Sequence, residues 1–173
     1  MKDLSQVELL HKWVEEAAKK KVKFELLWKG TRDGFKAKDF HTRCDKKGPT
    51  VTVIKSEHDK IFGGFTSESW GFAGSGGLQN KHDATAFIYS LTRKEKYAQQ
   101  LNSDSIGDIG YCGPTFGYAY LSDIFINDDC NTKGGVCWAN RTYQLPSGAE
   151  NSYLAGSYSY TVKEIEVYAV KNQ

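Results

Sequence analysis

Residues 24–70 constrain the fold of this chain more than any other stretch of its 173 residues. The pattern predicts a strand over Lys23–Lys29, a turn over Thr31–Gly34 and a short helix over Ala37–Asp45. A Gly48-Pro49 break then leads into a β-hairpin. Almost every residue in this stretch has a local structural role, and none belongs to an obvious catalytic arrangement. The stretch therefore favours a shaped binding domain over an enzyme.

The hairpin is predicted between Thr50–Glu57 and Lys60–Ser67. Its first arm begins with a β-branched run, which is typical of strands. Its second arm contains Gly63-Gly64, and glycines inside a strand mark a bulge, a bend or the close approach of another backbone. In the strand that precedes the hairpin, the two-residue period places three apolar side chains on one face: Phe24, Leu26 and Trp28.

An amphipathic helix is predicted over Gln6–Lys19, before the first strand. The run Ser5–Glu8 has the pattern of a capping box. Apolar residues then follow at helical spacing: Val7, Leu10, Val14 and Ala17. This helix would either pack on the domain or engage a partner. We therefore assign residues 1–21 to an N-terminal helix and residues 22–173 to the domain.

The rest of the chain has the pattern of short strands separated by loops. Three segments are predicted as strands: Ala84–Leu91, Asp123–Asn127 and Ser157–Val170. Gly71–His82 and Ile106–Gly117 are rich in glycine and are expected to be irregular. Within the last strand the apolar parity changes around Lys163-Glu164, which predicts a bulge or a change of neighbouring strands.

Composition is that of a β-rich globular domain without a strong electrostatic field. Aromatic residues make up 13% of the chain, and there are 17 glycines and 3 prolines. The net charge of +2 is too small to argue for a nucleic-acid partner. The basic run Lys19–Lys23 is interpreted as a solvated helix end.

Neither a secretory leader nor a membrane span is indicated, because charged residues interrupt every apolar run. We therefore expect an intracellular, cytoplasmic protein, with a cytoskeletal or ciliary location as one option. The four cysteines would then be reduced thiols. Cys130 and Cys137 are near enough in sequence to bridge, but a disulfide is the less favoured interpretation.

A series of short motifs runs in order along about residues 22–170. The motifs are Phe24–Leu27, Arg32–Phe35, Asp39–His41, Cys44-Asp45, Lys47–Thr50, Ile54–Ser56, Ile61–Ser67, Gly113–Gly117, Asp123–Ile126 and Val162–Tyr168. Each motif is short, and their number and order make the match specific. In these motifs and their order, the chain resembles the TLDc domain of oxidation-resistance proteins, and is most similar to the versions abundant in protists.

This resemblance implies a mainly β (α+β) fold, a two-layer antiparallel β-sandwich with a few short flanking helices. It also implies a role in the oxidative-stress response and, for several members, binding to the peripheral sector of the vacuolar proton-pumping ATPase. It carries over no catalytic residue, no metal ligand and no cofactor. The expected partner is a protein within a larger assembly, such as that ATPase or ciliary microtubules, with no nucleic acid, no membrane insertion and no obligatory small-molecule substrate.

The chain departs from the family pattern at two places. Lys36 stands where many relatives have a small hydroxyl residue that caps the following helix, and a missing cap typically costs about 1 kcal/mol. Tyr118–Leu121 replaces a more glycine-rich stretch, so partner choice is expected to differ from that of better-known relatives.

Two constellations suggest chemistry, and each has a structural alternative that we favour. Glu164 and Glu166 share one strand face, as a glycosidase pair would, or they form a solvated acidic face. His41 and Cys44 lie three residues apart on one helix, but a zinc site would need distant cysteines to converge on them, and we favour Cys44 as a core residue and His41 as a partly exposed one. No CxxC or HxxxH spacing supports that site.

Three further features are weaker. Cys112, in a glycine-rich loop, is expected to be the best exposed thiol, although no neighbour in sequence activates it. The glycine-rich run at residues 74–77 lacks the lysine and helix of a phosphate loop. An oxygen-rich loop suggests calcium or simple turn chemistry: Asp123, Asn127, Asp128, Asp129 and Asn131.

The sequence therefore predicts a non-catalytic interaction domain of the TLDc type. Two other classes stay open. One is a thiol- or carboxylate-dependent enzyme, and the other is a calcium- or carbohydrate-binding β-sandwich.

Overall fold

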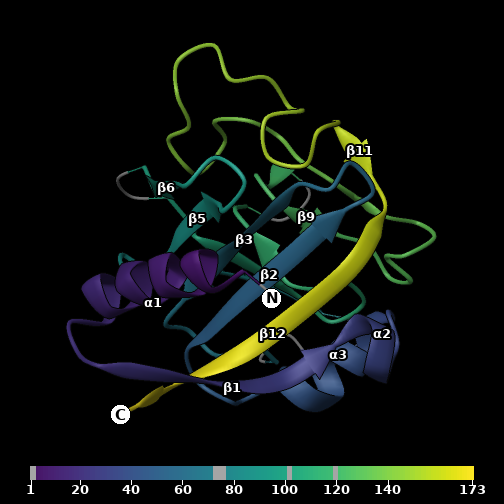
Figure 1. Ribbon diagram of the computed structural model, residues 1–173. Helices are drawn as coiled ribbons and strands as arrows, with labels where there is room; N and C mark the ends of the chain where they lie inside the picture. The colour runs from purple at the N-terminus through teal and green to yellow at the C-terminus, as the bar shows by residue number, and fades with distance from the viewer. Residues whose placement is uncertain (1–2, 72–76, 101–102, 119–120) are drawn as a thin grey trace.

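A six-stranded antiparallel sheet forms the centre of the molecule (Figure 1). The computed structural model describes residues 3–71, 77–100, 103–118 and 121–173. The strand order is β1-β12-β2-β3-β5-β6. The strands are β1 (Val22–Lys29), β2 (Thr50–Ser56), β3 (Ile61–Thr66), β5 (Phe87–Ser90), β6 (Glu95–Ala98) and β12 (Val162–Asn172). The predicted hairpin is confirmed as the adjacent strands β2 and β3.

Two three-stranded sheets form the second layer. One is β11-β10-β9 and the other is β4-β7-β8, joined through a bridge between Phe116 and Ile124. Their strands are β4 (Leu78–Lys81), β7 (Ile106–Ile109), β8 (Thr115–Phe116), β9 (Phe125–Ile126), β10 (Gly135–Val136) and β11 (Ser159–Tyr160). The larger core cluster contains side chains of both layers, such as Ile54 and Phe62 with Ile126. The fold is therefore a mainly β sandwich, as predicted.

Helix α1 (Leu4–Ala18) covers the opposite face of the large sheet (Figure 1). Leu10, Trp13 and Val14 are buried there in a second core cluster, together with apolar residues of β2, β3 and β5. The predicted helix is confirmed, but the predicted capping box is wrong. The cap is Asp3, whose carboxylate accepts a hydrogen bond from the Ser5 N–H (2.9 Å), so the helix begins before Ser5.

Two short helices follow β1, namely α2 (Gly30–Asp33) and α3 (Ala37–Cys44). The predicted turn is thus a single helical turn that ends at Gly34, where φ is +101°. α3 lies against β1, and its Phe40 packs between the rings of Trp28 and Trp70, with centroid distances of 5.5 Å to each. This aromatic group closes the end of the sandwich core beside β1.

Bulges in β1 and β12 decide which face each side chain occupies. In β1 the register shifts between Leu26 and Trp28, so Phe24 packs on the α1 side while Trp28 enters the sandwich core. The prediction that these three residues share one face is therefore wrong, because one extra residue inverts the alternation. In β12 the register shifts between Val162 and Glu164, which confirms the predicted bulge.

Strands β4, β7 and β8 lie in segments that were expected to be irregular. Each has four residues or fewer, and β7 pairs with both of the others. Such short strands depend on their partners rather than on local propensity, which explains why their composition misleads. Residues 72–76, within the first of these segments, lie outside the described residues.

Gly63 and Gly64 mark close approaches between neighbouring elements. A Cβ atom at Gly63 would lie 1.9 Å from the carbonyl oxygen of Thr52 on β2, and one at Gly64 would lie 2.5 Å from the Phe116 ring of the second layer. Of the three possibilities for glycines inside a strand, the structure thus shows close approach. Gly64 lets the second layer come close to β3, and Gly63 accommodates the neighbouring strand β2 within the large sheet.

We expect Gly63→Ala to lower the free energy of unfolding by about 2–3 kcal/mol, because the added methyl group collides with backbone that cannot move away. Chemical denaturation measures this change. Gly48→Ala is the control, since its Cβ meets open space and only its φ of +82° opposes substitution, at a cost of about 1 kcal/mol. Equal losses for the two variants would contradict the steric explanation.

Candidate functional site

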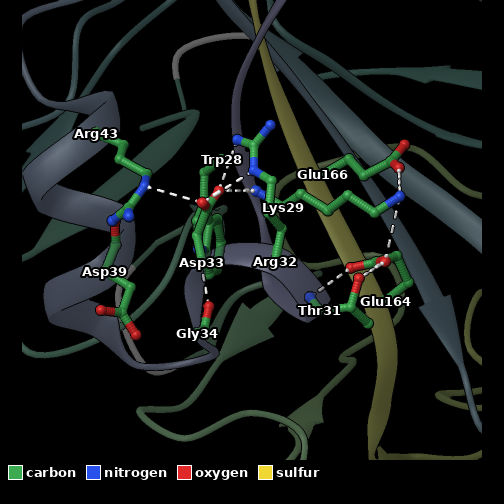
Figure 2. Close-up of polar contacts among 10 residues, drawn as sticks. All are labelled: Trp28, Lys29, Thr31, Arg32, Asp33, Gly34, Asp39, Arg43, Glu164 and Glu166. Carbon is green, nitrogen blue, oxygen red and sulfur yellow. Dashed lines mark hydrogen bonds and ion pairs between the residues drawn. The ribbon is translucent and has the colours of Figure 1, made fainter.

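The two glutamates predicted on β12 meet one lysine at the junction of β1, α2 and β12 (Figure 2). The Lys29 ammonium lies 2.7 Å from Glu166 Oε1 and 3.5 Å from Glu164 Oε2. Glu164 also accepts hydrogen bonds from the backbone N–H (3.1 Å) and the hydroxyl (2.5 Å) of Thr31. The glutamates are therefore brought together as predicted, but both are paired with Lys29 of β1, and Glu164 is also bonded to Thr31 of α2.

Glu166 is held as an anion. Its side chain is only 6% exposed and accepts hydrogen bonds from Lys29 and from the Tyr168 hydroxyl (2.6 Å). Burial alone would raise the pKa of this carboxyl, but the hydrogen bonds outweigh it and lower the pKa to about 2. A glycosidase acid needs the opposite shift, towards a raised pKa. Glu166 therefore has the electrostatics of an anchor.

Asp33 is a second anchor, and it fixes helix α2 on the side of Lys29 away from the two glutamates (Figure 2). It accepts hydrogen bonds from the Lys29 backbone N–H (2.9 Å) and from two nitrogens of Arg32 (2.9 and 2.8 Å). The Arg32 hydrogen bonds lower the pKa of Asp33 to about 2, against the effect of burial. Trp28 Nε1 donates to the Gly34 carbonyl (2.9 Å). The motif Arg32–Phe35 therefore holds α2 against β1.

A cleft of about 510 Å³ opens beside this network, between the start of α1 and the uncovered part of the sheet. Its lining includes Asp3, Gln6, Lys29 and Lys55, with Val53 and Ile61 at its floor. The volume is in the range of small-ligand pockets. Its walls carry both positive and negative groups, so its charge selects no single class of ligand.

His41 on α3 has partners at both ring nitrogens. Nδ1 lies 2.8 Å from an Asp45 carboxylate oxygen, and Nε2 lies 3.1 Å from the carbonyl oxygens of both Ile109 and Cys112. His41 therefore ties α3 to the β7–β8 connection and has no nitrogen left for a metal. Among the residues that the structure describes, no group of three or more metal-ligating side chains comes together. Cys44 is buried in the sandwich core.

All four cysteines are free and buried. Cys112 is the most exposed of the four, as expected, but at only 4% exposure it is buried and packs with Ile109 and Phe125. Burial raises the pKa of Cys112 to about 11 and that of Cys130 to about 12. The thiolate is the reactive form, so these environments suppress thiol chemistry.

The oxygen-rich loop uses its carboxylates to bind backbone. Asp123 is fully buried and accepts hydrogen bonds from the N–H groups of residues 141–143 (3.2, 2.7 and 3.3 Å), while burial raises its pKa to about 7. Asp128 accepts from the Ala37 N–H (2.9 Å) at the start of α3. Lys36 supplies no side-chain cap, but Asp39 accepts from its N–H (3.1 Å). Asp128, from a distant loop, and Asp39, from within α3, thus bond backbone N–H groups at the start of α3 in place of a capping side chain.

Asp83 is a buried anchor that the sequence interpretation missed. Its carboxylate accepts hydrogen bonds from the hydroxyl groups of Thr66, Ser67 and Thr85 (2.8, 2.9 and 2.7 Å) and from two backbone N–H groups. Burial opposes ionisation, yet these bonds lower the pKa of Asp83. The available signal was the Asp-x-Thr spacing, since Asp often bonds the backbone two residues on.

The fold and these anchors define a β-sandwich domain whose candidate catalytic groups are occupied by structural contacts. The family model of the TLDc domain matches residues 3–171, nearly the whole chain and including α1. The chain therefore belongs to the TLDc family. No curated protein sequence matches it. None of the helices among the described residues is long and apolar enough to cross a membrane.

We expect Glu166→Gln to lower the free energy of unfolding by about 2–3 kcal/mol at neutral pH. The pKa of Glu166 falls from an ordinary 4.5 to about 2 in the folded state. Its contribution is therefore complete above pH 4.5 and disappears as the pH falls towards 2. Urea unfolding of both proteins across this range should show the difference shrinking with acid.

Glu25→Gln is the matched control for that variant, because it removes the same charge from an exposed position of β1. A change below about 0.5 kcal/mol at neutral pH is expected. A Glu166→Gln protein that keeps the full pH dependence of the wild type would contradict the anchoring role.

We expect the native thiols to react with a disulfide reagent at least about 100-fold more slowly than those of the unfolded protein. The raised pKa of Cys112 alone, from 9.0 to about 11, reduces its thiolate by that order. Stopped-flow absorbance with and without guanidinium measures both rates. One thiol that reacts rapidly in the native protein would revive the thiol-enzyme alternative.

Proposed function

We propose that this protein is a non-catalytic, intracellular protein-interaction domain of the TLDc type that serves the oxidative-stress response by binding a larger assembly. One observation carries the proposal. The groups that a hydrolase or a peroxide scavenger would use are committed to holding loops in place. Glu164 and Glu166 are ion-paired with Lys29, and Cys112 is buried with a raised pKa.

The loops remain available for recognition. Large apolar side chains are exposed on the loops and short strands of the second layer: Leu78, Tyr111, Tyr118, Leu121 and Tyr158. Tyr118 and Leu121 bound the stretch that, by the family resemblance, is expected to replace a more glycine-rich one. Aromatic side chains often anchor protein interfaces. We infer that this region selects the partner, with the peripheral sector of the vacuolar proton-pumping ATPase as the first candidate and ciliary microtubules as the second.

Binding to purified peripheral sector, and separately to stabilised microtubules, tests the proposal. We expect co-elution or co-sedimentation of the wild-type protein with one of them, and loss of binding for Tyr118→Ser with Leu121→Ser. Leu4→Ser, at an exposed apolar position on α1, is the control. The proposal fails if neither assembly binds, and turnover of hydrogen peroxide or of an aryl glycoside would replace it with the enzyme alternative.

A further inference from the structure

Four segments of the chain converge at one end of the large sheet (Figure 1). The start of β1 pairs with the end of β12, with Lys23 directly opposite Lys171. On the other side of β12, the Val170 N–H donates to the carbonyl of Pro49 (2.9 Å), which places the residues before β2 alongside. The end of α1 leads into β1 and supplies the fourth segment.

These segments add lysines from two other parts of the chain to the basic run Lys19–Lys23. We call this surface the basic end, and define it by seven exposed residues: Lys19, Lys20, Lys21, Lys23, Lys46, Lys47 and Lys171. The chain has 23 Lys and Arg residues and a net charge of only +2, so these seven form a local excess that the overall charge conceals. Within the described residues, Lys21 is the one member with an ion pair, to Glu15 (2.8 Å).

The basic end carries a feature that opposes stability. Lys23 and Lys171 are like charges on directly paired positions, an arrangement that destabilises a sheet. An acidic partner would relieve this repulsion.

We propose that the basic end binds an extended acidic segment of a protein partner. Every cation here is lysine, whose flexible ammonium acts as a point charge, whereas arginine would suit fixed bidentate recognition of phosphate. None of the large exposed apolar side chains described belongs to the basic end, so nothing there would insert into a bilayer. Charges of this kind steer association and act without a fixed binding geometry.

Fluorescence anisotropy with a labelled oligoglutamate of about twelve residues, in about 50 mM salt, tests the inference. We expect Lys23→Glu with Lys171→Glu to weaken binding at least about tenfold. Lys36→Glu with Lys94→Glu is the control, since it changes the net charge equally on exposed lysines elsewhere, and we expect its affinity within about twofold of wild type. Wild-type binding should also weaken steeply as salt rises.

A single substitution separates binding from folding. Lys23→Glu converts the paired lysines into an opposite-charge pair, so its melting temperature should rise while its affinity for oligoglutamate falls. Lys23→Glu with Lys171→Glu restores like charges and should melt near the wild type. A fall in affinity that tracks a fall in melting temperature would overturn the inference.

Equal affinities of the two double variants would also overturn it. So would binding to vesicles of phosphatidylserine and phosphatidylcholine without binding to the peptide, which would assign the surface to a membrane. The inference rests on the proposed function, and the two can fail separately. An assembly that binds wild type and Lys23→Glu with Lys171→Glu equally well refutes the basic end alone. Oligoglutamate binding with no assembly bound refutes the proposed partners alone.

Discussion

Burial of the six-stranded sheet on both of its faces is the constraint on which the rest of the structure depends. The central strands β2 and β3 place apolar residues on each side, so one side needs the second layer and the other needs α1. Covering both faces requires close approach, which Gly63 and Gly64 permit. It also requires that the edge strand β1 serve two cores, and its bulge achieves this by turning Trp28 away from Phe24. The short helices and loops then have fixed surfaces on which to pack.

Sequence patterns predict the features of this fold that depend on a few neighbouring residues, and miss those that depend on contacts between distant parts of the chain. The hairpin, α3 and the bulge in β12 are visible because propensity, breakers and parity act over a few residues. The strands β4, β7 and β8 are not visible, because their stability comes from pairing across the chain. Burial of Cys112 escapes prediction for the same reason, since its neighbours Ile109 and Phe125 meet it only in the folded protein. The glutamate pair was predictable as a pair, but Lys29, which neutralises it, comes from another strand.

Several carboxylates of this domain share one structural role, which is to accept hydrogen bonds from the backbone. Asp33, Asp83, Asp123 and Asp128 each accept hydrogen bonds from backbone N–H groups of loops or helix starts. Such bonds replace water for groups that a turn leaves unpaired, and losing them costs more than an average hydrogen bond contributes. A small sandwich with many connections needs many anchors of this type. That need accounts for the structural roles of Asp33 and Asp123 within the family motifs.

Structural use of the acidic residues also shapes the outer surface. A carboxylate that is bonded to backbone or paired inside the fold cannot neutralise a distant lysine. Glu166 is paired with Lys29 and Asp33 with Arg32, beside the end of β1. At the other end of the same strand pair, Lys23 lies opposite Lys171, and the described residues place no carboxylate in an ion pair with either lysine. A chain of nearly balanced composition can therefore present one strongly basic end. The net charge of +2 conceals this separation, because the separation depends on which carboxylates have structural partners in the fold.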